Sequence, residues 1–150
     1  MPMQDAELRI SAGALKARGN EMAEGYTQIN LFDVEDAAAT NGFGERWEAR
    51  VARQALDATQ TGLTYFRLHP GKRSPFMHRH RQAEEVYVVL AGAGRVKLDE
   101  EILEVSALDA IRVAAEVARA FEAGPEGLEL IAFGPHRDGD GEPVKDSWVD

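Results

Sequence analysis

Apolar and polar residues alternate in short runs along most of the chain, which is the pattern of β-strands with one buried face. In the run 85–91, for example, Glu85, Tyr87 and Val89 share one face. The predicted strands are 26–32, 46–56, 62–68, 76–80, 85–91, 94–99, 101–105, 110–113, 118–123 and 128–133. Turn signals separate many of them: Pro70-Gly71, Gly92-Ala93-Gly94, Asp99-Glu100 and Gly124-Pro125. Many short strands at this spacing predict an all-β sandwich or barrel.

A single short helix is predicted near residues 33–40. Asp33 is a candidate N-cap, and the acidic residues Glu35 and Asp36 favour a first helical turn. Alanines form the body, and Asn41-Gly42 is a stop signal. We expect this helix to pack on the outside of the barrel.

The two ends of the chain differ from its centre. Residues 1–25 have weak apolar periodicity and predict an N-terminal arm. Residues 136–150 are rich in Gly and Asp and predict a C-terminal surface tail, which Trp148 would anchor. The barrel domain would therefore span residues 26–135.

Two histidines one residue apart are the first sign of chemistry. His78 and His80 lie on one face only if the backbone is extended, because side chains then repeat every second residue. Imidazoles with a carboxylate form sites for zinc, iron, nickel or manganese. The plainer interpretation is a pair of solvated histidines, since Arg79 and Arg81 flank them.

A carboxylate and a glycine follow the histidines at defined spacing. Four residues separate His80 from Glu85, and six separate Glu85 from Gly92. Glu84 fits a shorter gap to the histidines but breaks the spacing to Gly92, and strand parity points it to the other face. Glu85 is therefore the predicted partner of the two histidines.

This pattern resembles the first motif of the cupin superfamily, and the likeness extends over about residues 60–135. The resemblance implies a cupin-type jelly-roll β-barrel with one short N-terminal helix. It also implies a site for a divalent transition metal (Fe, Mn, Ni or Zn) with His78, His80 and Glu85 as ligands. Cupins commonly form dimers, so we expect a homodimer, held by apolar residues on the outer face of 46–56, Trp47 among them.

The second cupin motif departs from the family pattern. Over residues 108–123, Arg119 stands where the motif has its last histidine ligand, and a guanidinium cannot bind a metal. Three arrangements are open: a metal held by the remaining three residues, an Arg119–Glu85 ion pair in place of the metal, or a metal with a carboxylate substrate that bridges to Arg119. Arg119, Tyr87 and Arg67 are the candidate substrate-binding residues.

Composition restricts the class of protein. The chain has 150 residues, no cysteine and a net charge of −9. Acidity argues against a nucleic-acid partner, and no apolar run is long enough to cross a membrane. The absence of cysteine and of a signal pattern favours the cytoplasm.

Three functions from different classes fit these observations. One is a metal-dependent enzyme, such as an oxygenase or isomerase, acting on a small organic acid or polar metabolite. Another is a metal-free binder or sensor of a small-molecule ligand. The third is a barrel retained for assembly, because one fold hosts many functions.

Overall fold

The computed structural model describes residues 21–23, 25–145 and 148, and in this part the regular secondary structure is mostly β-strand. The elements are β1 (Glu21–Ala23), β2 (Tyr26–Gln28), a 3₁₀ turn (Leu31–Asp33), α2 (Ala37–Thr40), β3 (Trp47–Val51), β4 (Thr61–Leu68), β5 (Met77–His80), β6 (Glu85–Leu98), β7 (Glu101–Ser106), β8 (Ala110–Val113), β9 (Arg119–Pro135) and β10 (Gly141–Val144). The all-β prediction is confirmed. None of the described helices is long and apolar enough to cross a membrane.

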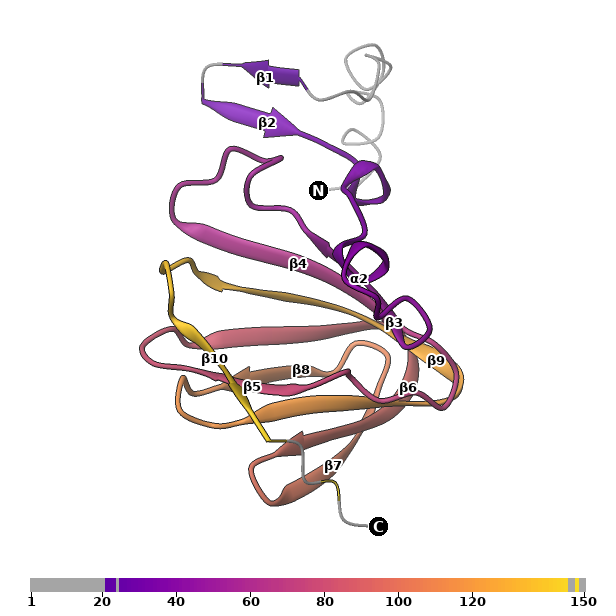
Figure 1. Cartoon of the computed structure of the whole chain (residues 1–150). Helices are drawn as coiled ribbons and strands as arrows, with labels where there is room; N and C mark the ends of the chain where they lie inside the picture. The colour runs from indigo at the N-terminus through magenta and orange to yellow at the C-terminus, as the bar shows by residue number, and fades with distance from the viewer. Residues whose placement is uncertain (1–20, 24, 146–147, 149–150) are drawn as a thin grey trace, which may run out of the picture.

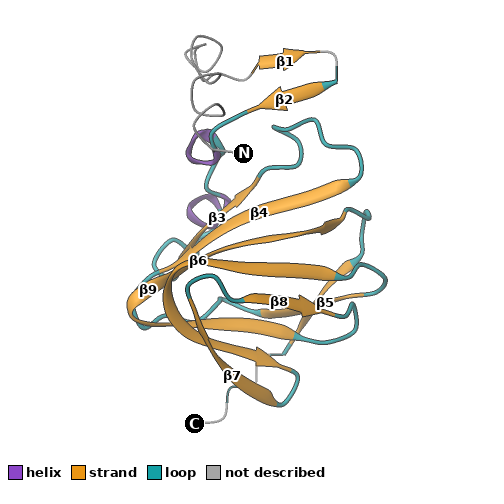
Figure 2. Ribbon diagram, turned by 180° about the vertical axis from the view of Figure 1, so that it is seen from behind, coloured by secondary structure: helices purple, strands orange, loops and turns teal. Residues whose placement is uncertain are grey.

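Strands β3 to β10 form one antiparallel sheet that curls into an open barrel (Figures 1 and 2). One path through the sheet runs β10-β5-β9-β4-β3, and β6 pairs with β7, β8 and β9. The first half of β6 pairs with the last part of β9, and its second half pairs with the first part of β9. These two long strands therefore connect the two walls of a jelly roll.

The two long strands bend where we predicted turns. Two pairings of β6 with β9, Gly92↔Leu128 and Gly94↔Ala123, leave residues 124–127 of β9 opposite Ala93 alone. The predicted turns at 92–94 and 124–125 are thus wrong, because each strand continues through a bulge. Glycine is required here: Gly92 has φ +80°, and a Cβ on Gly94 would collide with the backbone oxygen of Glu122.

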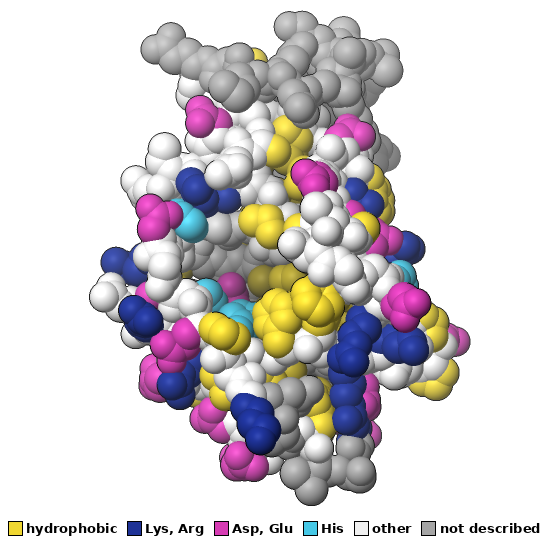
Figure 3. All heavy atoms as spheres, viewed as in Figure 1, with side chains coloured by type: hydrophobic (Ala, Val, Ile, Leu, Met, Phe, Trp, Pro, Cys, Tyr) yellow, Lys and Arg dark blue, Asp and Glu magenta, His cyan; other side chains and the backbone are white. Residues whose placement is uncertain are grey.

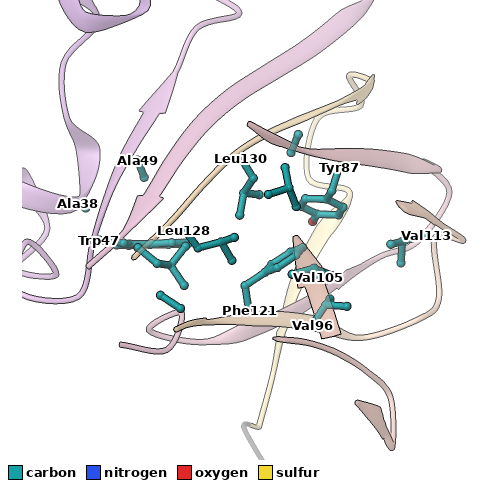
Figure 4. Packing of buried hydrophobic residues seen from close by; sticks show 14 residues of the cluster. Ala38, Trp47, Ala49, Tyr87, Val96, Val105, Val113, Phe121, Leu128 and Leu130 are labelled. Carbon is teal, nitrogen blue, oxygen red and sulfur yellow. The ribbon is translucent and has the colours of Figure 1, made fainter. Parts of the chain in front are cut away.

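The core lies between the two walls (Figure 4). Both halves of β6 contribute to it, since Val89 and Val96 are fully buried in the same cluster. Trp47 also belongs to this core and stacks on Phe66 with 4.7 Å between ring centroids. The prediction that Trp47 lies on the outer face of its strand is wrong, because the outer face carries Glu48. The homodimer itself stays a prediction.

The short helix α2 begins later than expected. Its N-cap is Asp36 rather than Asp33, and Asp33 ends the preceding 3₁₀ turn. The Asp36 carboxylate accepts hydrogen bonds from the backbone N–H groups of Ala38 and Ala49, both at 3.0 Å. This single side chain therefore starts the helix and fixes it to β3.

The C-terminal segment is more ordered than a surface tail. Its strand β10 pairs with β5, which places Gly141 opposite His80 and Pro143 opposite His78. Trp148 then packs against Met77, Ala118 and Ala120 on the outside of the barrel. The N-terminal arm lies mostly outside the described residues, except that Glu21–Ala23 form β1.

We expect Gly94→Ala to lower the free energy of unfolding by about 2 kcal/mol or more, because the added methyl group forces β6 and β9 apart at the bend. Gly62→Ala is the matched control, since a Cβ there meets its nearest atom, the Gly134 oxygen, at an ordinary 3.5 Å. Urea denaturation of both variants measures the difference. Equal stability of the two variants would show that the close approach at Gly94 does not constrain the fold.

Candidate metal centre

Strand β5 carries both histidines on one face. His78 and His80 point the same way because the chain is extended, and their ring centroids lie 5.2 Å apart. Arg79 points the other way, where it is exposed and its Nε donates to Glu142 on β10 at 2.5 Å. The alternation therefore separates the imidazoles from the surface charges around them.

Glu85 faces both imidazoles from the start of β6. His78 Nε2 lies 3.8 Å from Glu85 Oε1, and His80 Nε2 lies 3.6 Å from Oε2. The Tyr87 hydroxyl, on the same face of the strand, donates a hydrogen bond to Oε1. Burial raises the pKa of Glu85, but contacts with His78, His80 and Tyr87 outweigh it and hold the pKa well below the usual range. Glu85 is therefore ionised at neutral pH.

The three side chains lie close enough together that they could hold a metal ion. Their candidate ligand atoms all lie within 4.8 Å of one another. Two ligands that each lie 2.0–2.2 Å from one ion are at most about 4.4 Å apart, and both histidine-to-Glu85 distances fall inside that limit. His80 Nε2 is buried and has no hydrogen-bond partner among the described residues, so it is available as a ligand atom. His78, His80 and Glu85 could thus hold a divalent ion together.

Tyr87 lies deeper in the barrel than these ligands. It is buried, and its ring packs on Phe121 with 4.9 Å between centroids. Burial and the nearby charge of Glu85 raise the pKa of the phenol well above its usual value. Tyr87 therefore stays protonated and serves Glu85 as a hydrogen-bond donor, which agrees with its predicted place on the inward face.

Arg119 lies opposite His78 in the register of β9 with β5, and it is only 1% exposed. Its Nη2 donates to the Ala114 oxygen at 3.2 Å, whereas Nε and Nη1 form no hydrogen bond with any described residue. Among the described residues, no carboxylate oxygen lies within 4.0 Å of this guanidinium. The structure therefore contains no Arg119–Glu85 ion pair, which was one of the three arrangements considered above. Arg119, His78 and Tyr87 border an interior cavity of only about 20 Å³.

Arg67 does not lie with the candidate site residues His78, His80, Glu85 and Tyr87. Arg67 is exposed and pairs with Glu48 on β3, while its neighbours Phe66 and Leu68 face the interior. The prediction that Arg67 lines the pocket is therefore wrong, because its strand parity is outward. Glu84 is also exposed and pairs with Arg112, which agrees with the choice of Glu85 over Glu84.

Asp140 is a candidate site residue that the sequence did not indicate. Its Oδ2 lies 3.2 Å from His80 Nδ1, and its two oxygens accept the backbone N–H groups of Gln82 and Ala83. Burial raises the pKa of Asp140, but these amide hydrogen bonds and the contact with His80 hold it below the usual value. An Asp in a Gly-rich stretch looks like an ordinary loop residue, so only the pairing of β10 with β5 reveals this contact.

Two cavities open beside the three ligands, and Figure 3 shows histidine, acidic and hydrophobic side chains around a hollow on this face. One cavity, of about 400 Å³, is bordered by His80 and Glu85 together with Arg53 and Arg137. The other, of about 690 Å³, is bordered by His78 and mostly apolar side chains. Small-molecule sites commonly have such volumes, so a ligand has room to reach the candidate centre.

Comparisons with known proteins agree with this architecture. A family model described as a cupin domain matches residues 64–133. A cupin protein from Bacteroides fragilis has a similar structure, with a TM-score of 0.62, 22% identity, and coverage of 86% of this chain and 99% of that one. A search of curated proteins found no match.

Two further solved structures have named activities. A sugar phosphate isomerase of the cupin superfamily from Silicibacter pomeroyi gives a TM-score of 0.62 at 16% identity, over 79% of this chain and 92% of that one. An oxalate decarboxylase variant from Bacillus subtilis gives 0.57 at 20% identity, over 66% of this chain and 28% of that one. At such identities the likeness shows the fold alone.

We expect Asp140→Asn to weaken metal binding by about ten-fold, because the His80 ring loses the carboxylate charge that lies 3.2 Å from its Nδ1. Competition with a chromophoric chelator measures the affinity. The control is Asp138→Asn, since Asp138 is exposed and contacts only His136 among the described residues. If Asp140 served only the 82–83 backbone, the variant would lose stability but keep its metal affinity once folded.

Proposed function

Because the chain belongs to the cupin superfamily, we propose that it binds a divalent transition metal through His78, His80 and Glu85 and uses it to hold a small anionic or polar metabolite in the barrel. The observation that carries this proposal is the convergence of two imidazoles on one ionised carboxylate at the edge of a small-molecule cavity. A metal-dependent reaction on that metabolite, such as an oxygenation or isomerisation, is the activity that this site suits best.

Each residue has a distinct part in this proposal. When bound, the ion would supply Lewis-acid chemistry at positions that three protein ligands leave open. Glu85 contributes the only negative charge among the ligands, and Tyr87 fixes its orientation through the hydroxyl hydrogen bond. The Asp140 carboxylate, 3.2 Å from His80 Nδ1, would orient the His80 ring, whose Nε2 faces Glu85.

Charge favours an anionic ligand. Two neutral imidazoles and one carboxylate would leave a bound divalent ion with a net positive charge. The guanidinium of Arg119, which has no ion-pair partner among the described residues, borders the same small interior cavity as His78. Arg119 is too deeply buried to contact a ligand in the larger cavities, so we assign it a long-range electrostatic role.

The alternative is a metal-free barrel that binds a ligand or serves assembly. The substitution of Arg119 for the usual histidine is the observation that favours it, since a cation disfavours a metal nearby. Metal content decides between the two functions.

We expect the purified protein to bind one equivalent of iron, manganese, nickel or zinc. Glu85→Gln should weaken binding by about a hundred-fold, because it removes the only anionic ligand, and the His78→Ala, His80→Ala double variant should abolish it. Glu84→Gln is the matched control, since its side chain is exposed and pairs with Arg112. Elemental analysis and chelator competition give these values. A folded wild-type protein that takes up no metal would leave only the metal-free alternative.

For Arg119→Met we expect tighter metal binding, by several-fold, because a like charge is removed from the interior. The free energy of unfolding should rise by about 1 kcal/mol or more, since a buried cation that forms no ion pair with the described part of the chain is replaced by an apolar side chain of similar length. Chelator competition and urea denaturation measure the two effects. Weaker metal binding in this variant would contradict the electrostatic role of Arg119.

A further inference from the structure

An apolar groove lies where the barrel is open. The sheet path ends at β10 on one side and β3 on the other, and residues of both edge strands border this groove of about 690 Å³. The apolar side chains that line it include Phe43, Trp47, Ala49, Val51, Phe66 and Phe76. Its far wall is formed by β10, whose Glu142 points to Arg79 and Arg81.

Aromatic rings lead from the rim of the groove to the candidate metal centre. Phe43 packs edge-on against Phe76 at 6.1 Å, and Phe76 packs edge-on against Trp47 at 6.0 Å. Phe76 also contacts the His78 ring, with 6.4 Å between centroids. A molecule that covers these rings would therefore reach a metal ligand directly.

The rim exposes apolar surface at a functional site. Phe43 is 39% exposed, Phe76 40% and Val51 56%, whereas Trp47 is buried and Phe66 is half-buried. Contiguous exposed apolar surface of this kind marks binding sites. Since the surface is concave, is of small-molecule size and ends at His78, its occupant is a small molecule that also reaches the centre.

We infer that this groove binds the apolar part, an aromatic ring or a short alkyl chain, of a small carboxylate whose acidic group lies at His78, His80 and Glu85. The inference rests on the proposed metal centre, whose net positive charge selects the carboxylate. It goes further in assigning an amphipathic substrate and in naming Phe43 and Phe76 as the residues that recognise its apolar part.

The test compares two carboxylates that differ in one ring. Metal-loaded protein is titrated calorimetrically with phenylacetate and with acetate. We expect phenylacetate to bind at least about ten-fold more tightly, because the groove removes its ring from water.

The groove residues should control this ratio. Phe43→Ser and Phe76→Ser should each lower the ratio of phenylacetate affinity to acetate affinity several-fold. Phe43→Ser should leave acetate affinity and metal content unchanged, because Phe43 packs on Phe76 and not on His78. Both side chains are partly exposed, so the variants are expected to fold, and circular dichroism checks this. Leu103→Ser is the matched control, because Leu103 on β7 is 46% exposed and lies outside the groove.

The outcomes separate this inference from the proposal beneath it. Metal-loaded protein that binds both carboxylates equally, or does not bind phenylacetate, contradicts the amphipathic substrate but not the metal centre. If the wild-type protein binds no metal, the proposed metal centre is wrong, and so is the proposal that this centre binds the carboxylate group. If light scattering shows that Phe43→Ser or Phe76→Ser dissociates an oligomer while the ratio is unchanged, a second copy of the chain covers the groove and the inference is wrong.

Discussion

The close approach of β6 and β9 at their shared bend is the constraint on which the rest of the structure depends. The backbones come so near at Gly92 and Gly94 that no Cβ fits, and each strand passes there from one wall of the barrel to the other. Both walls can then bury residues of β6 in one core. The same course brings the start of β6, with Glu85, opposite the histidines of β5.

Burial then decides which protonation states the candidate centre holds. An ionised carboxylate that is largely removed from water needs hydrogen bonds and positive charge. Tyr87 and the two imidazoles supply the polar contacts of Glu85, whereas the guanidinium of Arg119 is not within ion-pair distance of it. A divalent cation between the imidazoles and Glu85 would add a further positive charge beside this carboxylate, which supports the proposed function.

Strand parity and motif spacing predicted what depends on neighbouring residues. They indicated that His78 and His80 share a face and that Glu85, not Glu84, joins them, and the geometry agrees. Contacts between distant segments were not predictable. Asp140 meets His80 only because β10 pairs with β5, and Arg67 faces outward because Trp47 and Phe66 fill the interior. The segment Gly92-Ala93-Gly94 predicts a turn but forms a bulge, because local sequence does not distinguish the two.

The replacement of a neutral imidazole by Arg119 changes the electrostatics of the site more than its shape. A histidine there would add a fourth ligand without charge, whereas arginine adds a fixed positive charge and leaves a coordination position open. A buried guanidinium beside a metal cation raises the free energy of both. An anion bound to the metal would lower the electrostatic free energy of the guanidinium and of the metal cation at the same time. Under the proposed function, Arg119 would therefore weaken the binding of the metal alone and strengthen the joint binding of a metal and an anionic ligand.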